Sequence, residues 1–306
     1  MNRSQFNKSV VPGLFALAIA AYKRKAKEAT WKKLCSTKNS NRAYEENVYF
    51  SGLGLPAKKP EGQPVTYDDF VQGPTKRWTH TTYGLATTVT EEMIEDSLYP
   101  EVPTEMGQQT AEIGASFAEL WEILVHDMFN NGTNTNNHTA GDGLALFSAS
   151  HVALRGGTWS NLLSPAADLS ATSLQTAIQE FTTVKDDTGK YQIVKPKYML
   201  VHPNNAWKTW ELLESAYDPE SANNAKNTLL KFGLKPLVSP YYTDTDAFTL
   251  IADSPNPTVG ICAFMRRAVK FAEDGDFDTG DFKFKGAARF SVECNKPLNL
   301  YHSAGA

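Results

Sequence analysis

The most regular hydrophobic pattern in the chain lies between residues 103 and 131. Apolar side chains recur there at every third or fourth position, namely at Ile113, Phe117, Leu120, Trp121, Leu124 and Met128. This spacing places them on one face of an α-helix. Pro103 suits the first helical turn, and Asn131 followed by Gly132 supplies a helix end. The pattern predicts a spine helix over residues 103–131, roughly 40 Å long at 1.5 Å per residue.

A shorter apolar stretch, residues 10–21, precedes a basic stretch at residues 22–33. We predict an amphipathic helix that begins after Pro12 and Gly13, with one face made of Phe15, Ile19, Tyr22 and Ala26. A secretory signal over residues 1–20 is the alternative, because this stretch contains small-x-small sites typical of signal cleavage. The Pro-Gly pair inside the apolar core and the dense Lys/Arg that follow favour the helix.

Residues 41–90 differ in composition from the helical stretches. Residues 43–50 and 76–83 resemble strands rich in aromatic and β-branched residues, and the stretch between them is rich in Pro and Gly. The pattern predicts a long β-hairpin with an irregular tip and too little apolar content for a core of its own. Because an isolated two-stranded ribbon is marginally stable at best, we expect this hairpin to pack on another molecule.

The rest of the chain mixes helices and strands. Helices are predicted at residues 170–184, after residue 204 with Trp207 and Trp210, and at residues 221–232; strands are predicted at residues 197–202, 237–238, 248–252, 259–264, 281–285 and 288–293. The fold class is therefore α+β.

Composition and charge exclude several classes of protein. The 306 residues are 41% hydrophobic and 21% charged, as in an ordinary globular protein, and no apolar run reaches the length of a membrane span. Three widely spaced cysteines argue against a disulfide scaffold and a structural zinc site. The net charge of −4 argues against a generic nucleic-acid-binding protein.

The charge is unevenly distributed along the chain. Residues 1–42 carry ten basic groups and one acid, so an arm with a net charge of +9 precedes a remainder with a net charge of −13. Such asymmetry is typical of an arm that meets acidic surface or nucleic acid.

We find no motif that assembles a catalytic site. A phosphate-binding glycine loop, HExxH and GxSxG are absent, and the six histidines are scattered. The aspartates between Asp274 and Asp281 resemble a calcium loop, but Thr279 and Lys285 occupy the positions that need Gly and Glu. We therefore expect no enzyme activity, catalytic residue, cofactor or metal site.

The order of the predicted parts resembles the major capsid protein family of tailed bacteriophages. Residues 143–148 (GLALFS) with Asn161, and residues 282–289 (FKFKGAAR), are also similar to stretches of that family. The resemblance implies the tailed-phage capsid fold, with the parts in this order: N-terminal arm 1–40, extended hairpin loop 41–90, peripheral domain 91–189 with the spine helix, axial domain 190–265, and return to the peripheral domain 266–306.

The resemblance also implies a function. The chain would be the structural subunit of an icosahedral phage head, assembling with copies of itself into pentamers and hexamers that enclose double-stranded DNA by non-specific electrostatics. Scaffolding, portal and decoration proteins are further expected partners; a membrane is not. Localisation would be the virion, after assembly in the bacterial cytoplasm. The residues expected at assembly interfaces are Tyr49, Phe50, Lys58, Lys59, Trp78, Tyr83, Lys23, Arg24 and Lys25.

Two departures from the family and two alternatives stay open. Many family members carry a scaffolding segment before the arm, for which this chain has no room, so scaffolding would be a separate protein or absent. Some members form Lys–Asn isopeptide crosslinks; Lys58, Lys59 and the asparagines of residues 130–137 could do so, but no acidic catalyst can be placed. The alternatives are a cellular encapsulating shell of the same fold around a protein cargo, and an exported binding protein or hydrolase with residues 1–20 as signal.

Overall fold

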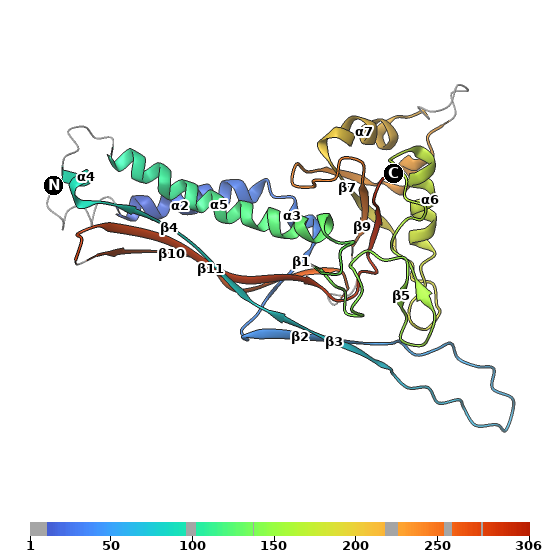
Figure 1. The fold of residues 1–306 in the computed structure, drawn as a ribbon. Helices are drawn as coiled ribbons and strands as arrows, with labels where there is room; N and C mark the ends of the chain where they lie inside the picture. The colour runs from blue at the N-terminus through green and yellow to red at the C-terminus, as the bar shows by residue number, and fades with distance from the viewer. Residues whose placement is uncertain (1–10, 96–101, 137, 218–225, 254–258, 277) are drawn as a thin grey trace.

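The computed structural model describes residues 11–95, 102–136, 138–217, 226–253, 259–276 and 278–306. Three parts are visible in Figure 1: an elongated helix-on-sheet layer, a more compact second domain, and a hairpin that projects beyond both. The chain passes between the two larger parts more than once, so each is built from segments that are distant in sequence.

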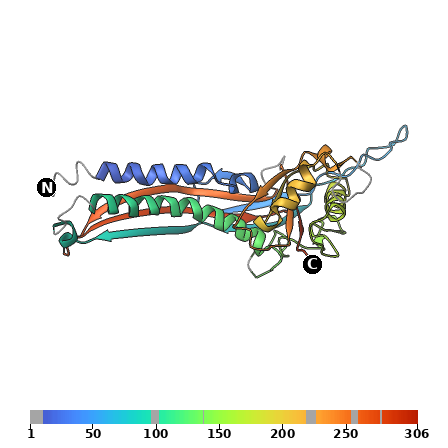
Figure 2. The same ribbon diagram turned by 90° about the horizontal axis from the view of Figure 1, so that it is seen from above.

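The elongated part is a four-stranded sheet in the order β1-β10-β11-β4. Strand β1 (Ser36–Asn39) runs parallel to β10 (Ile261–Gly275), which pairs antiparallel with β11 (Phe282–Cys294). Strand β4 (Thr81–Val89) pairs antiparallel with β11 and forms the outer edge. Helices α2 (Val11–Lys27) and α5 (Val102–Asn130) lie side by side along one face of the sheet (Figure 2). Two short helices, α3 (Trp31–Leu34) and α4 (Glu91–Glu95), complete this part.

The spine helix is confirmed, because α5 differs from the predicted range by one residue at each end. Ile113, Phe117, Trp121 and Met128 are all buried, and Leu120 and Leu124 pack against the same core. Close approach of the helix to the sheet depends on Gly286, since a Cβ there would lie 2.5 Å from the Phe117 ring. The periodic apolar stripe therefore does what its spacing predicts: it covers the sheet.

The N-terminal helix is also confirmed as α2, but α2 already includes Pro12 and Gly13, after which it was expected to begin, and the predicted apolar face is wrong in part. Leu14 and Ala18 are buried, whereas Ile19 is 41% exposed. The physical reason is that the helix backbone itself approaches α5: a Cβ at Gly114 would lie 2.2 Å from the Ala18 carbonyl oxygen. A contact between small residues sets the rotation of this helix, and hydrophobicity alone does not reveal it.

The second domain holds a four-stranded sheet in the order β12-β9-β7-β8. Its strands are β12 (Leu300–Ser303), β9 (Phe248–Ala252), β7 (Pro196–Val201) and β8 (Lys235–Val238). Helix α6 (Ala171–Thr182) packs on it through Leu174, Ile178 and Phe181, and Ser170 caps its start by accepting from the Ser173 N–H. The remaining elements are the 3-10 turns η1 (Pro203–Asn205) and η2 (Leu229–Phe232), helix α7 (Ala206–Glu214), and a small ribbon of β5 (His151–Val152) and β6 (Thr158–Trp159).

Several predicted elements differ from the observed ones. Of the helix predicted at residues 221–232, residues 221–225 lie outside the described part; the rest is an isolated bridge at Lys226 and the single turn η2, ended by Gly233 with φ 63°. The short strand predicted at residues 259–264 is the first part of the 15-residue strand β10. The two final predicted strands are one continuous strand, β11. The expected boundary between residues 265 and 266 divides β10, and β12 pairs with β9 in the second domain.

Candidate assembly surfaces

The projecting hairpin is built from β2 (Tyr44–Phe50) and β3 (Gln72–Thr79), paired antiparallel from Tyr44 opposite Thr79 to Phe50 opposite Gln72. The strand predicted at residues 76–83 is in fact two strands, because β3 belongs to the hairpin and β4 to the long sheet. His80 separates them; it is 3% exposed, and its ring nitrogens lie 3.0 Å from Ser291 Oγ and 3.1 Å from Ser40 Oγ.

The tip of the hairpin, residues 52–70, forms no helix or strand and extends away from the body (Figure 1). It exposes large apolar side chains, with Leu55 78%, Tyr67 89% and Phe70 64% exposed. Apolar side chains gathered on an exposed segment mark an interaction surface.

The base of the tip is anchored to the second domain's loops. The Arg155 guanidinium donates to Asp68 at 2.8 Å, to Ser51 Oγ at 3.1 Å and to the Asp69 carbonyl. The hydrogen bond from Arg155 is the main reason that the pKa of Asp68 is lowered. Lys190 Nζ donates to the Leu53 carbonyl at 2.5 Å. The direction in which the hairpin leaves the body is thus set by contacts within the chain.

One buried lysine and one half-buried lysine anchor the stem. Lys296 is 7% exposed and pairs with buried Asp187, and its Nζ lies 4.7 Å from the centre of the Tyr49 ring. Burial, with the nearby carboxylates, raises the pKa of Tyr49 to about 12. Lys76 Nζ donates to the carbonyls of Thr139 and Cys294 and lies 3.0 Å from Glu293. Each charge is paired, as burial requires.

The expected interface residues of the hairpin divide into two groups. Phe50 is 60% exposed, and Lys58 and Lys59 at the tip are exposed, so all three are open to a neighbouring molecule. Tyr49 is half-buried. Tyr83, expected on the hairpin, lies in β4 of the long sheet instead, where it is half-buried and stacks on Phe290 with ring centres 4.8 Å apart.

Trp78 requires a correction. We expected its side chain to be available to a neighbour, but it is 1% exposed, with its ring centre 4.8 Å from that of Phe264. It belongs to a small core where the hairpin meets the long sheet. Aromatic content alone does not distinguish an exposed side chain at an interface between subunits from a buried one that holds the stem in place.

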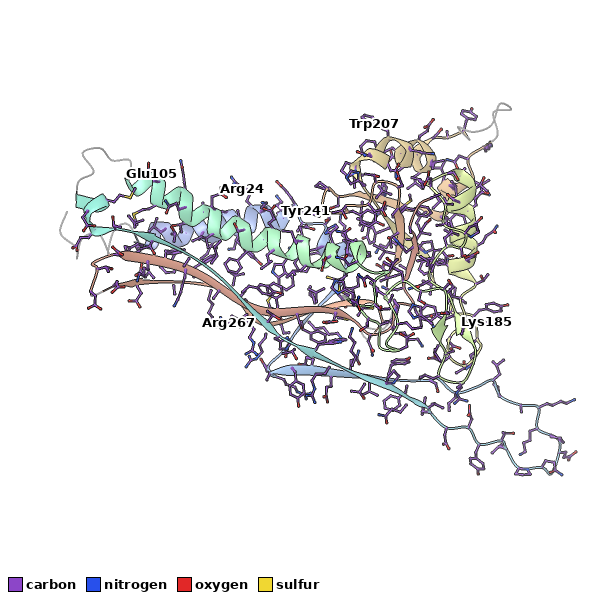
Figure 3. All side chains as sticks on the ribbon, in the orientation of Figure 1. Arg24, Glu105, Lys185, Trp207, Tyr241 and Arg267 are labelled. Atoms are coloured by element: carbon purple, nitrogen blue, oxygen red, sulfur yellow. The ribbon has the colours of Figure 1, made fainter. Side chains whose placement is uncertain are left out.

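The basic arm lies on acidic residues of the spine helix. Lys25 donates to Glu119, which lowers the pKa of that carboxyl. Glu122 accepts from the Thr30 backbone N–H at 2.6 Å, from Thr30 Oγ1 at 2.8 Å and from the N–H of Trp31, and so caps helix α3. Lys23 and Arg24 are exposed (Figure 3 labels Arg24). Part of the arm's charge is therefore neutralised within the chain, and part is available to a partner.

The structure argues against the signal-peptide alternative. Helix α2 continues through residue 20 to Lys27, and both Leu14 and Ala18 belong to the main core. Cleavage near residue 20 would remove core side chains from the folded protein.

The polar cluster around His151 lacks the accessibility that chemistry needs. His151 is fully buried, with Nδ1 2.7 Å from Asp142 and Nε2 3.2 Å from Asn161, whose amide donates to the Leu146 carbonyl. Burial raises the pKa of the Cys35 and Cys294 thiols, which opposes formation of reactive thiolates. Within the described ranges, no group of three or more His, Cys, Asp or Glu side chains could hold a metal ion. No helix among the residues that the structure describes is long and apolar enough to cross a membrane.

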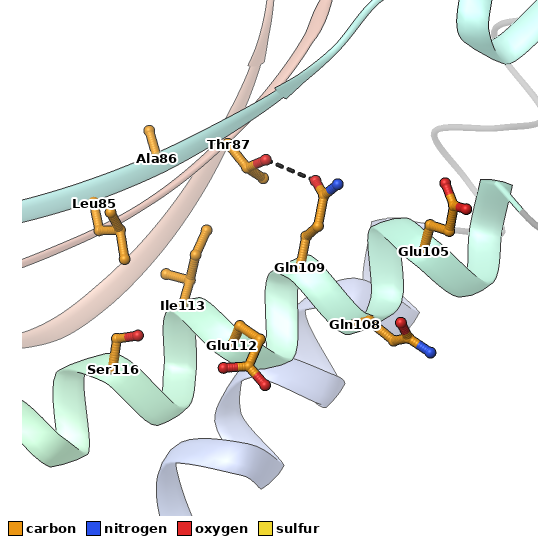
Figure 4. Close-up of a pocket in the computed structure, with 9 residues that line it drawn as sticks. All are labelled: Leu85, Ala86, Thr87, Glu105, Gln108, Gln109, Glu112, Ile113 and Ser116. Atoms are coloured by element: carbon orange, nitrogen blue, oxygen red, sulfur yellow. Dashed lines mark hydrogen bonds between the residues drawn. The ribbon is translucent and has the colours of Figure 1, made fainter.

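A shallow groove of about 540 Å³ runs between the edge strand β4 and helix α5 (Figure 4). Leu85 and Ile113 form part of its floor, Glu105 and Glu112 lie on its helical side, and Thr87 Oγ1 donates to Gln109 Oε1 at 2.7 Å. Ser116 follows Glu112 by one helical turn, but the lining residues include no histidine, lysine or cysteine. The groove exposes the unpaired edge of a sheet and offers no catalytic arrangement.

Comparison with known proteins agrees with this architecture. Residues 73–303 match the family model described as phage capsid protein. No curated protein matches the sequence. Among solved structures, the capsid of the cyanophage P-SCSP1u is similar with a TM-score of 0.59 at 10% identity, over 89% of this chain and 86% of that one.

Two further structures show the same fold. Mycobacterium phage Che8 gives a TM-score of 0.52 at 13% identity, over 90% of this chain and 92% of that one. The virus-like particle from Pyrococcus furiosus gives 0.53 at 10% identity, over 94% and 97%. The predicted α+β capsid fold is confirmed. The chain therefore belongs to the phage capsid protein family and is a structural subunit of a capsid shell.

Proposed function

We propose that this subunit assembles with copies of itself into rings of five and six that build the icosahedral head of a tailed phage around double-stranded DNA. The observation that carries the proposal is the hairpin: its stem is fixed by internal contacts, while its tip leaves the body and exposes apolar side chains that nothing in the described chain covers. In the assembled shell, the apolar side chains of the tip become buried against a neighbouring subunit.

The proposed assembly rests on non-covalent contacts and needs no covalent step. Head-to-tail contacts between identical subunits generate closed rings when the rotation closes. Each Å² of apolar surface that the tip buries contributes roughly 25 cal/mol, so small contacts repeated by symmetry stabilise a shell. In this proposal the hairpin of residues 44–79 lies across the neighbouring subunit, with Tyr49, Phe50, Lys58 and Lys59 near the contact.

The remaining parts take the roles that the family order implies. Residues 1–40 act as an arm. The elongated part, built on α5 and the sheet β1-β10-β11-β4, takes the role of the peripheral domain, and the second domain, built on the sheet β12-β9-β7-β8, takes that of the axial domain that converges at the ring centre. The exposed cations Lys23 and Arg24 of the arm meet packaged DNA through its phosphates, without reading sequence. Scaffolding, portal and decoration proteins are further proposed partners, and the proposed place of assembly is the bacterial cytoplasm.

Removal of the tip tests the proposal. Residues 55–66 are replaced by Asn-Gly, which keeps Ser51, Leu53, Asp68 and Asp69, the anchors to Arg155 and Lys190. We expect an unchanged circular dichroism spectrum and melting temperature, and no shells in electron micrographs where the wild-type chain forms them. Shells at wild-type yield from the shortened chain would refute the role of the hairpin.

The contents of purified wild-type particles separate the two kinds of shell. DNA inside them supports a phage head, whereas a protein cargo without DNA supports the cellular shell alternative.

A further inference from the structure

The long sheet has one uncovered face. Gly286 and Phe290 of β11 point at the helices, because a Cβ at Gly286 would touch Phe117 and the Phe290 ring stacks 3.8 Å from that of Trp121. Side chains alternate along a strand, so the odd-numbered residues of β11 point away from α2 and α5. Figure 3 shows Arg267 of the neighbouring strand β10 on the side of the sheet opposite to α5. No described element packs over the distal part of this face (Figure 1).

Cations concentrate on the uncovered face. Lys285 and Arg289 come from β11, and the register places Arg267 opposite Arg289 and Lys270 opposite Ala287, so these two cations of β10 share the face. Arg267, Lys270 and Lys285 are exposed, and none of the four makes an ion pair within the described part of the chain. Irregularities in β10 between Met265 and Lys270 help to gather these charges.

The distal end of the same part is acidic. Glu91 and Glu92 of α4 lie beside the turn that joins β10 to β11, since a Cβ at Gly280 would contact the Glu91 carboxylate. That turn carries Asp276, Asp278 and Asp281, and Glu273 and Asp274 lie at the end of β10 before it. Asp276 pairs with Lys283, whereas Glu92, Glu273 and Asp278 are exposed and make no ion pair with any described residue.

Arg267 and Arg289, which pair across the basic face, lie out of reach of the acidic end of their own subunit, whereas Lys285 lies diagonally across from Asp274 in the register. Arg289 lies seven residues from the start of β11, or roughly 23 Å at 3.3 Å per residue, and paired strands do not fold back over that distance. Two charges so far apart are beyond the Debye length of about 8 Å at physiological salt. The hairpin is not complementary either, because residues 43–79 carry five acids and four bases.

We propose that the acidic distal end of one copy, formed by α4 and the β10–β11 turn, docks on the basic uncovered face of a second copy around Arg267, Lys270 and Lys285. The proposal rests on the self-assembly proposed above and names a contact within it. Complementary charges on opposite sides of one subunit give a head-to-tail contact, the type that closes rings and shells.

Three variants of the full chain test the contact, with the assembled fraction measured by sedimentation and electron microscopy. The face variant is R267E/K285E, the end variant is E92K/D278K, and the third combines all four substitutions. Each double variant places like charges together, so we expect the assembled fraction to fall at least about tenfold. The combined variant restores opposite charges and is expected to recover shells. K185E/K195E, which makes the same charge change on exposed loops before β7, is the matched control and is expected to assemble as wild type.

The outcomes separate the hypotheses. Shells from the wild type and from both double variants would overturn the contact and leave the proposed function intact. A wild-type chain that remains monomeric would refute the proposed function and the contact with it. Loss in the face variant alone, with no recovery in the combined variant and with less bound nucleic acid, would assign the face to phosphate binding and overturn the proposal. If R267E/K285E fails to fold, E92K/D278K decides the matter, because its substitutions lie outside the sheet's paired core.

Discussion

The spine region and the projecting hairpin obtain their order in opposite ways. Around the spine helix, Trp121 stacks between Trp31 and Phe290, with ring centres 4.9 and 3.8 Å away, and each of the three is at most 5% exposed. The hairpin tip has almost no buried side chain and is tethered through polar contacts at its base. The difference shows that stability and assembly are separated in space: substitutions in the spine region act on folding, and those in the tip act on contacts between subunits.

The largest expected effect is on the free energy of unfolding, from a substitution in the core around the spine helix. Trp121→Ala removes a 2% exposed indole from the core and is expected to lower the free energy of unfolding by about 3–5 kcal/mol. Phe50→Ser, on the 60% exposed hairpin residue, is expected to change it by no more than about 0.5 kcal/mol and to reduce shell formation instead. Urea denaturation and electron microscopy measure the two effects. Equal destabilisation by both substitutions would contradict the separation.

A smaller effect is expected where α2 meets the spine. Gly114→Ala places a Cβ 2.2 Å from the Ala18 carbonyl oxygen, so α2 must shift, at a cost of about 1–3 kcal/mol. Gly13→Ala is the control, because nothing lies within 4 Å of its Cβ position and Ala favours a helix by up to about 1 kcal/mol. Thermal unfolding distinguishes them: we expect a lower melting temperature for the first and an equal or higher one for the second. Tolerance of Gly114→Ala would show that the arm is loosely packed.

The smallest expected effect concerns pH. His126 on α5 is fully buried, its Nδ1–H donates to the Glu122 carbonyl at 2.7 Å, and Tyr241 and the Glu122 carboxylate are its polar neighbours. Burial lowers the pKa of His126 below its ordinary value of 6.5. The unfolded chain therefore binds the proton more readily, so stability is complete above pH 6.5 and falls as the pH drops below it.

The measurement is the melting temperature between pH 7.5 and 5 for the wild type and His126→Gln. The decline below pH 6.5 should be shallower in the variant, while proteolysis at the hairpin tip should respond to pH equally in both chains. An identical slope in the two chains would remove His126 as the cause.

Local patterns in the sequence were sufficient for most of the elements, but not for the helix predicted at residues 221–232, of which the described part forms only an isolated bridge and the turn η2. The apolar repeat from Ile113 to Met128, the capped helix after Ser170 and the Pro/Gly-rich hairpin tip were predicted because short-range periodicity and turn chemistry are properties of neighbouring residues. The order of those elements was enough to indicate the capsid fold. Exposure was harder to predict, because it depends on what lies across from a side chain. For this reason Trp78, which was expected to be available to a neighbour, is buried, and Ile19, which was expected on the apolar face of its helix, is exposed.

The sequence by itself determined most of the helical and extended segments, and that a hairpin and a basic arm precede a mixed body. Tertiary structure alone decided that Arg267, Lys270, Lys285 and Arg289 share one face, because that depends on the register of β10 against β11 and on the side of the sheet that the helices cover. It also decided that Glu119 and Glu122 of the spine hold the arm. Contacts between residues so far apart along the chain carry no local signal, because they arise only when the packing of whole elements brings them together.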